Sequence, residues 1–131
     1  MNSSILLNAF NDQLTELFID IITIFPNNID IKMAQNSLGL IRKTNPKLTI
    51  KIWKTYIVDK YGDKFDSEDI AFFIEKDYST DLSKIDSFNK IMEAVDRIRD
   101  PIKLMNPSDK KKTMKYLSNL KKLCCLYHEL I

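Results

Sequence analysis

"FNDQLTELFIDIITIF", residues 10–25, is the stretch that decides the fold class. Asp12, Glu16 and Asp20 recur every four residues on one side of it. Large apolar residues recur at spacings of three and four on the other side, which is the period of a helix face: Phe10, Leu14, Leu17, Phe18, Ile21, Ile22 and Phe25. Pro26 follows, and proline cannot continue a helix because it lacks a backbone N–H donor. The pattern predicts an amphipathic helix over residues 4–25.

Two later segments repeat this period. Residues 83–99 are predicted to form a helix that Pro101 ends, on the apolar row Ile85, Phe88, Ile91, Met92, Val95 and Ile98. The last helix is predicted from Asn106, a good N-terminal cap, through Pro107, whose missing N–H would be unpaired at that position anyway. It runs to about residue 129 on Met114, Leu117, Leu120, Leu123, Cys124 and Tyr127.

The segment of residues 30–44 has a weaker helical pattern. Asp30 is the expected cap, and the apolar row is Met33, Ala34, Leu38 and Ile41. Gly39 in the interior costs about 1 kcal/mol relative to alanine. We expect it to permit close packing against the first helix.

The stretch "RKTNPKLTIKIWKTY", residues 42–56, contains the start of a third predicted helix. Asn45 is a suitable cap, Pro46 suits the first turn, and Gly62 suits the end. The alternative is a strand, because "TIKIW" alternates and is rich in β-branched residues. The two helix ends and a length of about 16 residues favour the helix, with the buried row Leu48, Ile52, Trp53, Tyr56, Ile57 and the stem of Lys60. Residues 67–76 fit a short helix or a buried strand.

The composition supports a helical chain. Its 131 residues include two glycines and four prolines, whereas strands joined by tight turns usually need more glycine. A chain of this length forms about one domain. We therefore predict an all-α fold, a single helical domain over residues 1–131 built as a compact bundle of about five to six helices.

The cysteines and the apolar runs bear on the compartment. Cys124 and Cys125 are adjacent and are the only cysteines. Neighbouring cysteines rarely form a disulfide because the small ring strains the peptide, so a reducing compartment is expected. No apolar run reaches the roughly 20 residues of a membrane span. The start, "MNSSILLNAFNDQL", has no basic region, so no signal peptide is expected.

Catalytic patterns are weak. The single histidine, His128, lies at i, i+3 from Cys125, and two ligands are too few for a zinc site. The acids of "YGDKFDSED", residues 61–69, do not match a calcium loop and are typical of a helix start, although one sequence leaves carboxylates for a divalent metal open. No glycine-rich phosphate loop occurs. We predict no enzyme, no cofactor and no metal site.

Charge alternates along the chain, although the net charge is only +2. Residues 1–31 carry four acids and no base, and residues 32–61 carry seven bases and one acid. Residues 62–100 carry six bases and eleven acids, and residues 101–131 carry seven bases and two acids. This alternation indicates oppositely charged faces that meet inside the fold or between subunits. A protein partner or self-association is therefore expected.

The basic residues form the candidate interaction face. Lys47, Lys51 and Lys54 lie at i, i+4, i+7, a ridge that can follow a phosphate backbone. Trp53 and Tyr56 fall on the apolar row, so they are expected in the core rather than stacked on bases. Nucleic-acid binding is the alternative to a solvated face or a patch for an acidic protein. The candidate face consists of Arg42, Lys43, Lys47, Lys51, Lys54, Lys110, Lys111, Lys112 and Lys115.

Four stretches together resemble a family: "FNDQL" (10–14), "IFPNNIDIKMA" (24–34), "IRKTNPK" (41–47) and "FFIEKDYSTDL" (72–82). The family consists of short uncharacterised proteins encoded by giant DNA viruses of algae and other protists. The resemblance covers roughly residues 8–82 and a basic, leucine-rich C-terminal helix. It contains no catalytic motif. It implies a compact helical viral protein in the host-cell cytoplasm or the virion.

Three functions are considered. The first is a non-enzymatic interaction or structural protein, such as a minor virion component or an assembly adaptor. The alternatives are a nucleic-acid accessory protein that uses the basic helix faces, and a host-directed factor that docks one helix into a host protein.

Overall fold

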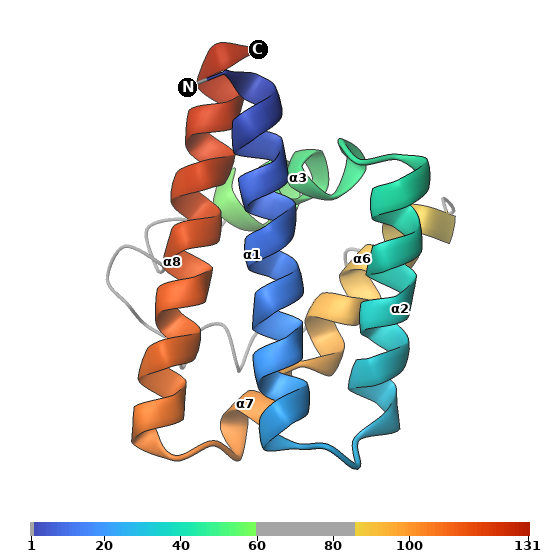
Figure 1. Ribbon diagram of the computed structural model, residues 1–131, viewed down its shortest axis with the longest axis vertical. Helices are drawn as coiled ribbons and strands as arrows, with labels where there is room; N and C mark the ends of the chain where they lie inside the picture. Colours follow the sequence, from blue (N-terminus) through green and yellow to red (C-terminus); the bar gives the residue numbers. More distant parts are fainter. Residues whose placement is uncertain (1, 60–85) are drawn as a thin grey trace.

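The computed structural model describes residues 2–59 and 86–131 (Figure 1). Every regular element in these two ranges is a helix, so the all-α prediction is confirmed. The elements are α1 (Ser3–Ile24), α2 (Ile29–Thr44), α3 (Leu48–Ile52), the π-helix η1 (Trp53–Val58), α6 (Asp86–Arg97), α7 (Arg99–Lys103) and α8 (Pro107–Leu130).

The long helices form two layers. In Figure 1, α1 lies between α8 and α2 in the front layer, antiparallel to both, and the two chain ends meet at the top. Behind them, α6 packs on α2, and η1 packs on α8. Because α1 is covered on both sides and from behind, its apolar face becomes the centre of the core.

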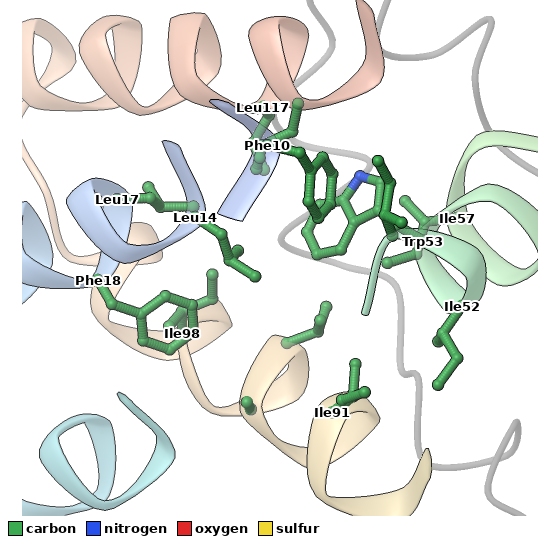
Figure 2. Close-up of a cluster of buried hydrophobic side chains, with 14 of the residues drawn as sticks. Phe10, Leu14, Leu17, Phe18, Ile52, Trp53, Ile57, Ile91, Ile98 and Leu117 are labelled. Carbon is green, nitrogen blue, oxygen red and sulfur yellow. The ribbon is translucent and has the colours of Figure 1, made fainter. Parts of the chain in front are cut away.

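The core gathers side chains from both layers (Figure 2). Phe10, Leu14, Leu17, Phe18 and Ile21 of α1 are buried, as predicted, and Ile22 and Phe25 are half-buried. Trp53 lies edge-to-face against Phe10, with ring centroids 5.8 Å apart, and Ile91, Ile98 and Leu117 complete the cluster. Each such side chain contributes roughly 1.5–3 kcal/mol on full burial.

The second helix differs from its prediction in its start and its buried face. Asn28, not Asp30, is the cap, and its side-chain oxygen accepts from the Ile31 N–H at 3.2 Å. Met33 is 54% exposed, and Ile31 is buried instead, together with the predicted Ala34 and Ile41. The Asp30 cap and the Met33 core position were therefore wrong: Asn28 caps the helix, and α1 and α6 cover the face of α2 that carries Ile31, not the face that carries Met33.

Gly39 does not permit close packing, contrary to the prediction. It is exposed, and a Cβ added there would have no heavy atom within 4 Å. The residue therefore leaves open space beside α2 rather than a close contact with α1.

The predicted helix start at Asn45 and Pro46 was also wrong. The Asn45 N–H donates to the Ile41 carbonyl at 2.7 Å, so Asn45 ends α2, and α3 begins only at Leu48. The Pro46 carbonyl accepts from the Asn11 side-chain amide at 3.1 Å. This tertiary bond holds the turn between the two helices. The helical interpretation itself is confirmed over the described residues 48–59, and Ile52, Trp53 and Ile57 are buried as predicted, with Leu48 and Tyr56 half-buried.

The C-terminal helices follow their apolar rows. Phe88, Ile91, Met92, Val95 and Ile98 are buried, as predicted. Pro101 does not end the helix: the break lies at Ile98, and Pro101 is buried in the first turn of α7, where its missing N–H costs no helical bond. In α8 the predicted row is buried, except that Leu123 is half-buried. The predictions for Lys60, Gly62, residues 67–76 and Ile85 lie outside the described residues.

The two Asn–Pro pairs allow a matched test of capping. The Asn106 side-chain oxygen accepts from the Asp109 N–H at 2.8 Å, whereas the Asn45 side chain makes no hydrogen bond to any part of the chain that the structure describes. We expect Asn106→Ala to lower the free energy of unfolding by about 1 kcal/mol. Asn45→Ala should change it by less than about 0.5 kcal/mol. Urea denaturation of both variants measures the difference, and equal losses would contradict it.

Candidate functional site

The nine basic residues of the candidate face lie in two separate places. Lys110, Lys111, Lys112 and Lys115 occupy the first turns of α8, at the lower end of Figure 1. The other five lie at the end of α2, in the turn that follows it, and on α3 and η1. Cys124 of α8 places its Sγ 3.5 Å from the Ile50 carbonyl of α3. Lys112 and Cys124 are about three turns apart on α8, or about 18 Å. The structure therefore does not bring the nine cations into one continuous face.

Three of the nine cations are paired with acids inside the fold. Arg42 contacts Asp12 at 2.7 Å and Lys112 contacts Asp20 at 2.9 Å, so α1 is joined to α2 and to α8. Lys54 bonds Asp59. The hydrogen bond to Asp20 raises the pKa of Lys112, and the bond to Asp59 raises that of Lys54. The predicted meeting of opposite charges is thus confirmed within the fold.

The lysine ridge of residues 47, 51 and 54 is reduced by this pairing. Lys47 and Lys51 are exposed, and so is Lys43 at the end of α2. Among the residues that the structure describes, these three have no ion-pair partner. Lys54 is half-buried and bound to Asp59. The free basic group is therefore Lys43, Lys47 and Lys51, which we call the basic corner.

The aromatic residues beside the ridge belong to the core, as predicted. Trp53 is 1% exposed, and Tyr56 lies edge-to-face against Phe88 with centroids 4.7 Å apart. Neither ring is placed to stack on a base. The Trp53 Nε1–H has no hydrogen-bond acceptor in the described ranges.

A row of exposed apolar side chains runs along α2. Ile29, Met33 and Leu40 are 69%, 54% and 63% exposed. They lie at i, i+4, i+11, which places them on one helix face, and we call them the outer ridge of α2. Sequence reasoning missed this ridge because it assigned one apolar face to a helix that carries two. The signal was that Ile29, Met33 and Leu40 have helical spacing of their own.

A pocket of about 520 Å³ lies between α1 and α2, and we call it the α1–α2 pocket. Leu14 and Phe18 of α1 and Leu38 of α2 supply apolar walls. Arg42 and Lys43 supply two cations at one end, where Asn11 and Thr49 also lie. Gln35, Asn36, Gly39, Leu40 and Thr15 complete the lining. Sequence reasoning missed the pocket, and Gly39, read as a packing residue, marks its open wall.

His128 packs beside the buried cysteine of α8. The neighbour of His128 is Cys124, not Cys125: His128 Nδ1 lies 3.7 Å from the Cys124 Sγ and 2.8 Å from the Cys124 carbonyl oxygen. Burial raises the pKa of the Cys124 thiol to about 12, so the nucleophilic thiolate is scarce. Within residues 2–59 and 86–131, no three His, Cys, Asp or Glu side chains gather as metal ligands.

Comparisons with protein-family models, curated proteins and solved structures found no match. Among the described helices, none combines the length and the apolar character that crossing a membrane requires.

Cys124 predicts a specific pH dependence. The unfolded thiol ionises near its ordinary pKa of 9.0, whereas the folded thiol stays protonated up to about 12. The unfolded state therefore binds fewer protons in that window, and the free energy of unfolding falls as the pH rises through it. In Cys124→Ala this component is absent, so its stability should fall less between about pH 8 and pH 10. Urea denaturation at both values measures the slope.

Cys125→Ala is the matched control because it keeps the Cys124 thiol, so its free energy of unfolding should still fall more steeply than that of Cys124→Ala. Equal slopes for all three proteins would contradict the assignment.

Proposed function

We propose that this chain is a non-enzymatic protein-binding or structural protein and that the outer ridge of α2 is its contact surface. The observation that carries the proposal is the ridge itself, three large apolar side chains kept in solvent on one helix face. Exposed apolar rows with polar surroundings are typical of protein contacts. Covering each side chain contributes roughly 1.5–3 kcal/mol at full burial.

Charge around the ridge indicates the kind of partner. Lys32 and Lys43 are exposed on the same helix. Two of the three acids of α1 already have cationic partners, since Asp12 pairs with Arg42 and Asp20 with Lys112. A partner helix with an apolar stripe and acidic flanks matches this surface, because opposite charges set the register of two packed helices.

The biological setting follows from the sequence resemblance. The four stretches that resemble giant-virus proteins lead us to propose a minor virion component or an assembly adaptor, in a reducing host-cell cytoplasm or in the particle. A host-directed factor that docks into a host protein would use the same ridge. Catalysis forms no part of the proposal, because the buried Cys124 thiol and the single His128 provide no activated nucleophile.

Site-specific photo-crosslinking tests the proposal. A photoreactive phenylalanine at Met33, expressed in the source cells, should give one discrete adduct, because that side chain points into the contact. The same residue at Leu104, which is 76% exposed after α7, is the matched control. The measurement is the mass of each adduct. Equal labelling at both sites, or no adduct at Met33 from a chain that light scattering shows to be monomeric, would sink the proposal.

Nucleic-acid binding is the second candidate, and the basic corner favours it. Lys43, Lys47 and Lys51 are exposed cations with no partner among the described residues. The separation of the Lys110–Lys115 group along α8 argues against a long track for a phosphate backbone. The corner is therefore expected to contact few phosphates.

Fluorescence anisotropy with a labelled duplex tests this candidate. Binding at about 50 mM salt should weaken steeply by about 200 mM, because each neutralised phosphate releases a counterion. Lys47→Glu with Lys51→Glu should abolish it, and Lys110→Glu with Lys111→Glu should not. An absence of binding at the lower salt concentration excludes the candidate.

A further inference from the structure

The α1–α2 pocket has the size and the lining of a small-molecule site. Its volume of about 520 Å³ lies within the roughly 300–1,000 Å³ of ligand pockets in proteins. Its walls come from three elements, α1, α2 and α3. It is separate from the outer ridge of α2 except at Leu40, which stands at its rim and is 63% exposed.

The two ends of the pocket differ in chemistry. Asn11, Thr49 and Arg42 lie at the end where α2 terminates, because Asn11 bonds the Pro46 carbonyl and Arg42 bonds Asp12. Phe18 of α1 is seven residues beyond Asn11, which is about 10 Å along the helix. The pocket therefore has a cationic end, from which the apolar walls of Leu14, Phe18 and Leu38 extend, and Gln35 and Asn36 line the far end with them.

The cationic end contains unused hydrogen-bond donors. Thr49 is 4% exposed, lines the pocket, and its hydroxyl has no hydrogen-bond partner in the described ranges. Asn11 is also 4% exposed. The side-chain amide nitrogen of Asn11 donates one N–H to the Pro46 carbonyl. Its second N–H can still donate. The Thr49 hydroxyl and the second N–H of the Asn11 amide can therefore donate to a ligand in the pocket.

The net positive charge at the cationic end of the pocket favours an anionic group on the ligand. Arg42 and Lys43 are both in the lining, and Asp12 offsets one of them. Arg42 uses its Nη2 on Asp12 and keeps further N–H donors, which suit a carboxylate. The surplus is a single positive charge, so a monoanion matches it.

From this arrangement we propose that the α1–α2 pocket binds a small carboxylic acid with an apolar tail. The carboxylate lies at the end with Asn11, Thr49 and Lys43, and the tail lies against Leu14, Phe18 and Leu38. Leu40 belongs to both the pocket and the outer ridge, so binding is tested on the isolated chain, with no partner protein on α2.

Octanoate is the probe for the test, with octanol and octylamine as controls for the head group. Titration of the isotope-labelled chain by NMR should show saturable shifts with octanoate and binding at least tenfold weaker with both controls. Equal binding of octanoate and octanol would overturn the carboxylate assignment. An absence of saturable binding up to about 10 mM would overturn the site, because weaker binding carries no specificity.

Variants locate the site. Gly39→Trp fills the pocket, since a side chain there meets open space, and it should abolish binding. Lys32→Trp adds the same ring to an exposed position of α2 outside the lining and should leave binding unchanged. Lys43→Gln and Thr49→Val should each weaken octanoate binding severalfold, while the thermal midpoint of Lys43→Gln stays unchanged. Undiminished binding by Gly39→Trp and Lys43→Gln would place the ligand elsewhere and overturn the proposal.

Discussion

The edge-to-face contact between Phe10 and Trp53 is the interaction on which the arrangement of the layers depends. Phe10 stands on α1, and Trp53 begins η1 in the layer behind it. Both rings are almost fully buried, and such pairs add about 0.5–1.5 kcal/mol to the area that they cover. Because α8 also packs on both α1 and η1, this contact fixes where three helices meet. Within residues 2–59 and 86–131 the indole N–H has no acceptor, and the tryptophan is instead packed against Phe10 and its apolar neighbours.

Local signals predicted α1 and α8 well, and tertiary contacts explain the errors elsewhere. The apolar spacing of α1 and the cap at Asn106 depend only on residues that are close in the sequence. Both could therefore be predicted without knowledge of the tertiary structure. The pair Asn45–Pro46 is the same dipeptide as Asn106–Pro107, and the same helix start was expected for both. The turn at Asn45 and Pro46 is instead held by Asn11, 35 residues away in the sequence. No local rule separates the two pairs. The face of α2 was misassigned for a similar reason, since neighbours decide which of its two apolar rows is covered.

The candidate surfaces were harder to predict because each needs residues from several helices. The basic residues were identified by type, but their pairing with Asp12, Asp20 and Asp59 depends on how α1, α2, η1 and α8 pack. Charge alternation along the chain correctly indicated that acids and bases would meet. The pocket had no sequence signal beyond a glycine in a helix interior. A pocket arises from how helices pack against one another, and the spacing of apolar residues in the sequence does not predict it.

The π-helix has a consequence for how the chain tolerates changes in length. Each residue of an α-helix turns the chain by about 100°, and a π-turn accommodates one residue more than an α-turn. In η1 that additional residue lies between Trp53 and the buried pair Ile57 and Val58. Loss of one residue from this segment would remove the surplus and restore α-helical geometry, and Trp53 and Ile57 would then stand at i and i+3 on the same helix face. The segment is therefore a place where the chain can shorten by one residue without turning its buried side chains outward.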